Sequence, residues 1–295
     1  MPFSSVLHCG PSGWSHPHWN AVVYPDPKPK GFHGLDYLAQ RFDTVEISSS
    51  FSEPLKPELT RLWARKVEAN PAFRFTVKLA RRFTHERVLD AAEVKAFEEG
   101  LMPLAKAGKL GCVLMQFPWS FRFTKENRDF LIQLRRTFHK FPLAAEMRHV
   151  SWSMDEAIGT MIDYHIAFCN IDQPSYTKAM PPTSFLTSSI GYVRLHGRNC
   201  FNWYQDNYDP ATSHRYDYLY SEEELLAWKK RIDNIRSCAE HTYVVFNNDS
   251  RGKSVTNALQ MQQLLGMRSM EPVNLKDLKR PAQTSLFTEY RKAVA

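Results

Sequence analysis

Short apolar runs alternate with amphipathic stretches along nearly the whole chain. Eight of the runs predict buried β-strands: residues 6–9, 44–48, 73–78, 111–117, 143–148, 166–171, 192–196 and 243–247. Between them, apolar residues recur at helical spacing, as Leu35, Leu38 and Phe42 do, and Ser221 and Glu224 have the spacing of a capping box. Eight strands separated by helices predict a parallel sheet closed into a (β/α)8 TIM-barrel-like domain. An open doubly wound sheet is the alternative, although no GxGxxG motif follows the first strand.

The pattern stops near Met267. Residues 1–266 are therefore predicted to form a single β/α barrel domain. Residues 267–295, which contain Pro272, Pro281 and several charges, are predicted to be a flexible C-terminal tail.

Composition narrows the class of protein. Apolar residues make up 43% of the chain, but no apolar run approaches the length of a membrane span, and the N-terminus has no secretory signal. Five scattered cysteines without a CxxC pair argue against a disulfide framework and a zinc ribbon. We therefore expect a cytoplasmic protein with no membrane partner. The net charge of +7 is compatible with an anionic ligand.

Polar residues alternate with apolar ones near the ends of the predicted strands. In a barrel, the apolar set faces the helices, so the polar set faces inward, and the chemistry sits where the strands end. The inward polar residues are Glu46, Ser48, Lys78, Gln116, Glu146, Arg148, Arg194 and His196, with Arg198 just beyond strand seven and Asn247, Asn248 and Asp249 after strand eight. Charges of both signs predict one shared polar pocket. A salt-bridge network that merely closes the barrel is the alternative.

Residue types suggest roles within that pocket. Glu46 and Glu146 are candidates for general base or metal ligand, and His196 for acid/base catalyst. The candidate substrate or phosphate contacts are Lys78, Gln116, Arg148, Arg194, Arg198, Asn247 and Asp249, with Trp14 of the first loop as a stacking surface. Trp14 could equally pack over the barrel rim.

Seven motifs identify a family. They are residues 13–15 (Gly-Trp-Ser), 42–46 (Phe-Asp-Thr-Val-Glu), 73–78 (Phe-Arg-Phe-Thr-Val-Lys), 116–118 (Gln-Phe-Pro), 146–152 (Glu-Met-Arg-His-Val-Ser-Trp), 192–198 (Tyr-Val-Arg-Leu-His-Gly-Arg) and 245–249 (Val-Phe-Asn-Asn-Asp). Over residues 6–266 the chain resembles the YecE-like family, domain of unknown function 72. The resemblance implies a barrel distantly similar to the endonuclease-IV and xylose-isomerase type, but no established reaction. Two positions depart from the family pattern: the Ser49-Ser50-Phe51 run, and Val150 where proline is common.

The endonuclease-IV type holds a metal cluster with several histidines and carboxylates. Here His196, with His85 as a second candidate, is the histidine expected near the strand ends, so three zinc ions are under-supplied with ligands. One oxygen-rich Mg²⁺ or Mn²⁺ site, or none, fits better.

The tail carries a second signal. Gln283, Leu286 and Phe287 match the QxxLF peptide by which bacterial replication and repair proteins dock on the DNA sliding clamp. An unstructured segment can insert two apolar side chains into a cleft while a glutamine anchors it. The alternative is that Leu286 and Phe287 pack back onto the barrel.

Three hypotheses about function follow. The first is an enzyme that hydrolyses phosphoesters in a phosphorylated small molecule or DNA. The second is a non-catalytic nucleotide or nucleic-acid binding module recruited by the sliding clamp. The third, which depends on the barrel analogy, is a sugar isomerase or hydrolase that uses the paired carboxylates.

Overall fold

Eight parallel strands form the centre of the molecule. The computed structural model describes residues 5–200 and 214–267. The strands are β1 (Val6–Pro11), β2 (Thr44–Ile47), β3 (Arg74–Lys78), β4 (Leu110–Gln116), β5 (Leu143–Glu146), β6 (Ala167–Asp172), β7 (Ile190–Leu195) and β8 (His241–Phe246). Each pairs with its neighbour in sequence from β2 to β8, and β8 also pairs with β1. All eight predicted strands are present, with ends shifted by one or two residues.

The sheet closes between its first and second strands. Ser12 and Glu46 form a parallel bridge, and the backbone N–H of Gly13 donates to the Glu46 carbonyl at 2.9 Å. Ser12 also donates its N–H to the Phe246 carbonyl at 2.9 Å, which joins it to the end of β8. The predicted (β/α)8 barrel is therefore confirmed, and the open doubly wound sheet is wrong.

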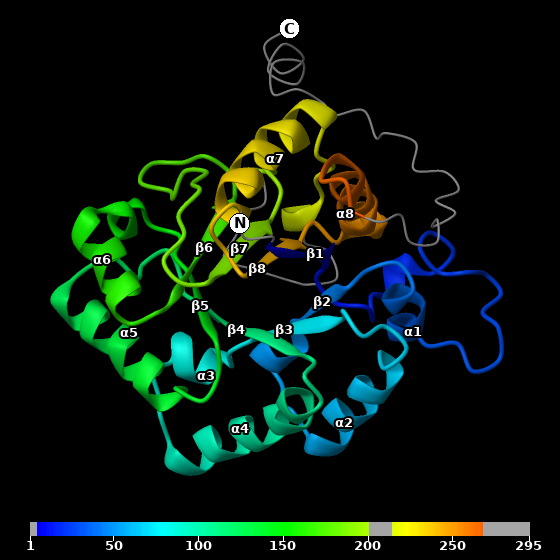
Figure 1. The fold of residues 1–295 in the computed structure, drawn as a ribbon, viewed down its shortest axis with the longest axis horizontal. Helices are drawn as coiled ribbons and strands as arrows, with labels where there is room; N and C mark the ends of the chain where they lie inside the picture. The colour runs from blue at the N-terminus through cyan, green and yellow to red at the C-terminus, as the bar shows by residue number, and fades with distance from the viewer. Residues whose placement is uncertain (1–4, 201–213, 268–295) are drawn as a thin grey trace, which may run out of the picture.

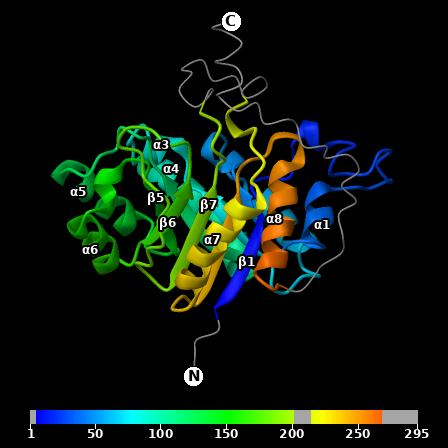
Figure 2. The ribbon, with the colours of Figure 1, turned by 90° about the horizontal axis from the view of Figure 1, so that it is seen from above.

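Helices surround this barrel (Figure 1). They are α1 (Gly34–Ala39), α2 (Pro57–Lys66), α3 (Arg81–Thr84), α4 (Ala91–Lys106), α5 (Lys125–Thr137), α6 (Asp155–Asp163), α7 (Glu222–Arg236) and α8 (Lys253–Leu264). Figure 2 shows α7 and α8 lying along the outer face of β1 and β7. The capping box predicted for Ser221 and Glu224 is present at the start of α7. None of the helices in the described ranges is long and apolar enough to span a membrane.

The core lies between the outer faces of the strands and the helices. The predicted stripe of α7 is buried there, with Leu225, Trp228 and Ile232 each 1% exposed or less. Cys9, Cys112 and Cys169 are fully buried free thiols, as their apolar surroundings predict. Burial of one face of each helix is what holds the outer ring on the sheet.

One wall of the barrel departs from the expected alternation. Residues 173–189, all described, connect β6 to β7 without a helix. Pro174, Pro181 and Pro182 fall in this segment, and proline removes a backbone donor and clashes within a helix. The same segment shortens β5, because Met180 donates its N–H to the Arg148 carbonyl at 2.8 Å. Arg148, predicted to lie on strand five, therefore follows it.

Candidate functional site at the carboxyl end of the barrel

Arg194, near the end of β7, lies at the centre of a group of buried charges. We call Glu46, Glu146, Arg148, Arg194 and His196 the ion cluster. Arg194 Nε and Nη2 donate to Glu46 Oε2 and Oε1 at 3.0 and 2.8 Å, which is the bidentate geometry of a strong ion pair. Alternation along β2 and β7 brings these side chains together, because apolar neighbours occupy the outward positions.

The remaining guanidinium donors of Arg194 are also engaged. Nη1 donates to Glu146 Oε2 at 2.8 Å and to Gln116 Oε1 at 3.1 Å, and Nη2 donates to Asn247 Oδ1 at 2.8 Å. All five N–H groups of Arg194 thus have protein acceptors. A phosphate could bind Arg194 only by displacing one of these acceptors, so Arg194 orders the cluster.

Glu146 contacts two further members of the ion cluster. Its Oε1 accepts from Arg148 Nε at 2.9 Å and lies 3.2 Å from His196 Nε2. Asn247 fixes the tautomer of His196. Arginine can only donate, so the Asn247 amide oxygen faces Arg194 and its nitrogen donates to His196 Nδ1, 3.2 Å away. The His196 proton then resides on Nε2 and points at Glu146.

Burial and neighbouring charges set the protonation states. Burial alone would raise the pKa of both carboxyls. At Glu46 the positive charges of Arg194 and Lys78 outweigh the effect of burial. At Glu146 the hydrogen bond from His196, together with the charges of Arg194 and Arg148, outweighs it. The pKa of each carboxyl is therefore below its usual value. Burial lowers the pKa of His196 to about 4. The two glutamates are anionic and the histidine neutral near pH 7.

Lys78 ends β3 beside the ion cluster and is only half-buried. Burial, followed by repulsion from Arg194, lowers the pKa of Lys78 to about 8. Among the residues that the structure describes, its ammonium group has no hydrogen-bond or ion-pair partner, and Nζ lies 5.6 Å from the centre of the Phe51 ring. The Phe51 ring packs edge-on against His85 at 5.1 Å. Lys78 therefore differs from Arg148 and Arg194, which are both paired with glutamates.

Arg198, Asp249 and Trp14 were predicted to belong to the site but contact residues outside the ion cluster. Arg198 makes a bidentate ion pair with Asp172 and a second one with Glu224, which turns it toward α7. Asp249 pairs with His16 of the first loop, 3.2 Å away.

Trp14, expected as a stacking surface, packs edge-on against Trp63 of α2 at 4.9 Å. It also lies 6.2 Å from the Phe75 ring. Trp14 therefore covers the rim of the barrel, which is the alternative that the sequence left open.

The sequence reasoning missed several members of the site. The Tyr192 hydroxyl donates to Glu46 Oε2 at 3.1 Å, and Ser12 donates to Glu46 Oε1 at 3.0 Å. Tyr192 stands two residues before Arg194, so the same alternation could have found it. His16 and His18 also escaped attention, although the loop after β1 must meet the loop after β8 in a closed barrel. Gln283, Leu286 and Phe287 lie outside the described residues.

Fold and site together define a (β/α)8 barrel whose carboxyl end is closed by a buried ion cluster. The chain belongs to the family described as "Protein of unknown function DUF72", whose sequence profile matches residues 8–283. It is 29% identical over 273 residues to UPF0759 protein YunF of Bacillus subtilis, an alignment that covers 88% of this chain and 95% of YunF.

Two solved structures share the fold. A DUF72 family protein of Thermotoga maritima has 30% identity and a TM-score of 0.75, covering 88% of this chain and 99% of its own. A DUF72 family protein of Enterococcus faecalis has 26% identity and a TM-score of 0.78, covering 92% of this chain and all of its own. These likenesses establish the barrel for nearly the whole chain.

Proposed function

We propose that the carboxyl end of the barrel binds a phosphorylated ligand, whose phosphate contacts Lys78. The observation that carries this proposal is the half-buried ammonium group, which has no protein partner in the described residues and lies beside an otherwise saturated ion cluster. Glu46 and Glu146 are offset by Arg148 and Arg194, so Lys78 adds one uncompensated positive charge. An anion placed there gains an ion pair without breaking another.

Binding is better supported than catalysis by the ion cluster itself. Glu46 and Glu146 each accept hydrogen bonds from arginine, and both nitrogens of His196 have partners. All three groups are held by hydrogen bonds or ion pairs to neighbouring side chains, which favours a role in holding positive charge at this end of the barrel. Phosphoester hydrolysis by these three residues therefore stays a prediction.

The ion pairs of Glu46 and Glu146 with Arg194 favour the anion-binding proposal over glycoside hydrolysis, which is one form of the sugar-directed alternative. A glycoside hydrolase needs one carboxylic acid that stays protonated to donate to the leaving group. Both glutamates have lowered pKa values, so neither is such a donor near pH 7. The paired carboxylates are better explained as the counter-ions of Arg194.

The experiment compares a nucleoside monophosphate with its nucleoside by titration calorimetry. Lys78→Gln removes the charge, and Lys95→Gln, at a side chain that is 76% exposed, is the matched control. We expect measurable affinity for the phosphate ester alone, weakened about tenfold or more by Lys78→Gln and unchanged by Lys95→Gln. Equal affinity for the nucleoside, or no effect of Lys78→Gln, contradicts the proposal.

A second arm tests chemistry and partners. Release of phosphate from the bound ester or from abasic or nicked DNA, with Mg²⁺ or Mn²⁺ and abolished by Glu146→Gln, would make the protein a hydrolase. Saturable binding without turnover would make it a binding module. Pull-down with a bacterial sliding clamp, before and after deletion of residues 281–295, tests recruitment through Gln283, Leu286 and Phe287. Unchanged binding ends that part of the proposal.

A further inference from the structure

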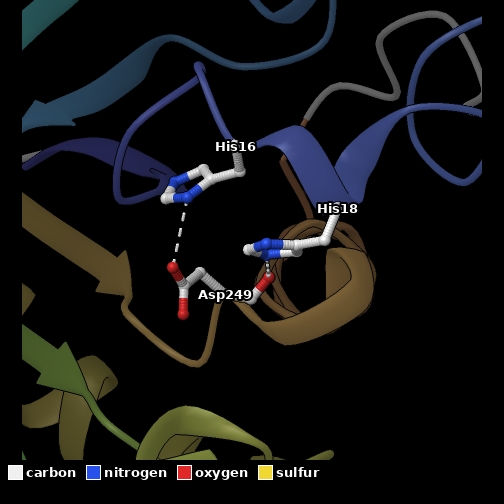
Figure 3. Close-up of side chains that lie close together, drawn as sticks. All are labelled: His16, His18 and Asp249. Carbon is white, nitrogen blue, oxygen red and sulfur yellow. Dashed lines mark hydrogen bonds and ion pairs between the residues drawn. The ribbon is translucent and has the colours of Figure 1, made fainter. Parts of the chain in front are cut away.

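Three side chains converge where the loop after β1 meets the loop after β8 (Figure 3). One ligand atom each from His16, His18 and Asp249 can be chosen so that all three lie within 4.8 Å of one another. None of them belongs to the ion cluster. Two imidazoles and a carboxylate are a donor set common in metal sites.

Hydrogen bonding orients His16 toward the aspartate. Its Nε2 lies 3.0 Å from the Ser12 carbonyl oxygen, which can only accept, so the proton is on Nε2. The other nitrogen, Nδ1, lies 3.2 Å from Asp249 Oδ2. Two lone pairs that face each other at this distance require a cation between them. A metal-bound histidine usually donates its second N–H to a carbonyl, as His16 does.

His18 favours a metal ion over a shared proton. A shared proton needs two groups only, whereas here a ligand atom of His18 also lies within 4.8 Å of those of His16 and Asp249. The ring of His18 lies 5.4 Å from that of His16, and its Nε2 contacts the backbone carbonyl of Asp249 at 3.0 Å. Because a carbonyl oxygen can only accept, the His18 proton is on Nε2 and Nδ1 keeps its lone pair.

The surrounding structure fixes this arrangement. Trp19 is fully buried, packs on the His16 ring at 4.5 Å and donates from its indole N–H to the Asp249 carbonyl at 2.8 Å, which ties the two loops together. Gly13 has a φ of +76°, and a Cβ there would lie 2.5 Å from His16 Nε2. Glycine at this position therefore makes room for the imidazole.

We propose that His16, His18 and Asp249 bind a divalent transition-metal ion of the zinc type. Imidazole nitrogens select Zn²⁺ and its neighbours over Mg²⁺ and Ca²⁺, which prefer oxygen ligands. Three protein ligands leave room for a further ligand from solvent or substrate. The proposed ion differs from the oxygen-rich Mg²⁺ or Mn²⁺ expected from the sequence, which stays a prediction; the carboxylates of Glu46 and Glu146 are paired with arginines.

Ser12 places this site next to the ion cluster. Its carbonyl accepts from His16, while its hydroxyl donates to Glu46 Oε1 at 3.0 Å. Asp249 also follows Asn247, which contacts Arg194, by two residues. The metal site and the proposed anion site therefore share one end of the barrel, although metal binding does not depend on the proposed function.

The test is equilibrium dialysis of metal-stripped protein against Zn²⁺, with Mg²⁺ as a comparison. All proteins carry Cys238→Ser, which removes an exposed thiol that could bind zinc. The test variants are His18→Ala, at an exposed side chain, and Asp249→Asn, and the matched control is His139→Ala, at an exposed histidine on another surface. Circular dichroism checks that each variant is folded.

We expect one Zn²⁺ per chain in the background protein and in the His139→Ala variant. In the His18→Ala and Asp249→Asn variants the affinity should fall by about tenfold or more. Co²⁺ in place of Zn²⁺ should give visible absorption bands that the same two variants lose. Absence of stoichiometric Zn²⁺ binding, or equal binding by His18→Ala, Asp249→Asn and His139→Ala, overturns the proposal.

Discussion

Arg194 and Glu46 form a two-point ion pair in which neither side chain has any exposed surface. A buried ion pair of this kind adds little to the free energy of unfolding compared with two apolar side chains of the same shape, because both charges lose their hydration on folding. Removing one partner is different, since the other is left buried and uncompensated. The pair therefore makes the carboxyl end of the barrel intolerant of single changes.

The Glu46→Gln variant should be destabilised by about 3 kcal/mol, because Arg194 loses a charged acceptor inside the barrel. Urea unfolding followed by circular dichroism measures the difference. Asp36→Asn is the control, since the Asp36–Lys66 pair is partly exposed, and it should cost less than about 1 kcal/mol. An equal decrease in the free energy of unfolding in the two variants would contradict the claim that breaking the buried pair costs more than breaking the partly exposed one.

Ligand affinity should depend on pH through Lys78. Its pKa of about 8 means that the ammonium form predominates below pH 8 and is lost above it. Affinity for a phosphate ester should therefore be level between about pH 7 and 7.5 and fall above pH 8, approaching about tenfold per unit. Calorimetric titrations from pH 7 to 9.5 measure this. The Lys78→Gln variant should show no such fall, and a fall of the same size in it would assign the titration to another group.

Gly13→Ala and Gly31→Ala separate backbone strain from contact with His16. Both glycines have positive φ, +76° and +79°, so alanine is strained at each by about 1 kcal/mol. Only at Gly13 does the added Cβ meet a side chain, because nothing lies within 4 Å of it at Gly31. Thermal unfolding should show a larger loss for Gly13→Ala, and Zn²⁺ binding should weaken in that variant alone. Equal Zn²⁺ affinities would place the metal elsewhere.

Asp43, which directly precedes β2 at the amino end of the barrel, should make the stability of the protein fall as pH rises. Burial raises its pKa from 3.8 to about 7, so the folded state holds the proton more tightly than the unfolded state. The stabilisation is complete below about pH 4 and is lost as pH rises to about 7. Asp43→Asn removes this dependence and keeps an acceptor for the Cys9 N–H.

Relative to the Asp43→Asn variant, the wild type should lose about 3–4 kcal/mol of unfolding free energy between pH 4 and pH 7.5. Urea unfolding at the two pH values measures this difference. Burial lowers the pKa of the neighbouring His8 to about 3, below this range, so in the folded state His8 stays neutral in both proteins. A constant difference across the range would contradict the raised pKa.

The sequence predicts the barrel well because a strand pattern occurs eight times and helical spacing separates most of the strands, so that each repeat supports the others. It also brings Glu46, Glu146, Arg194 and His196 together, since parity decides which side of a strand a residue faces. It could not tell which charges neutralise one another. Arg198 turns to Asp172 and Glu224, a choice that depends on where α7 starts, and helix position is not encoded in strand parity.

The His16, His18 and Asp249 group shows a second limit. Asp249 is more than 200 residues from the two histidines in sequence, and all three lie on loops, where neither the two-residue nor the 3.6-residue period applies. Only the parallel pairing of β1 with β8 brings the two loops together. The prediction of a closed barrel already implies that the loops after β1 and β8 are neighbours, so comparing the residues of these two loops would have identified the group.

The helix-free wall between β6 and β7 has a consequence for local stability. A helix would satisfy its own backbone, whereas this segment relies on side chains: Asn170 accepts from the Phe185 N–H at 2.8 Å and donates to its carbonyl at 2.9 Å, and the Thr187 hydroxyl accepts from the Phe168 N–H at 2.8 Å. A few side-chain hydrogen bonds thus do what a helix does with a regular series of backbone hydrogen bonds. Loss of one of them by substitution should cause local unfolding of residues 173–189 while the other seven β/α units stay folded.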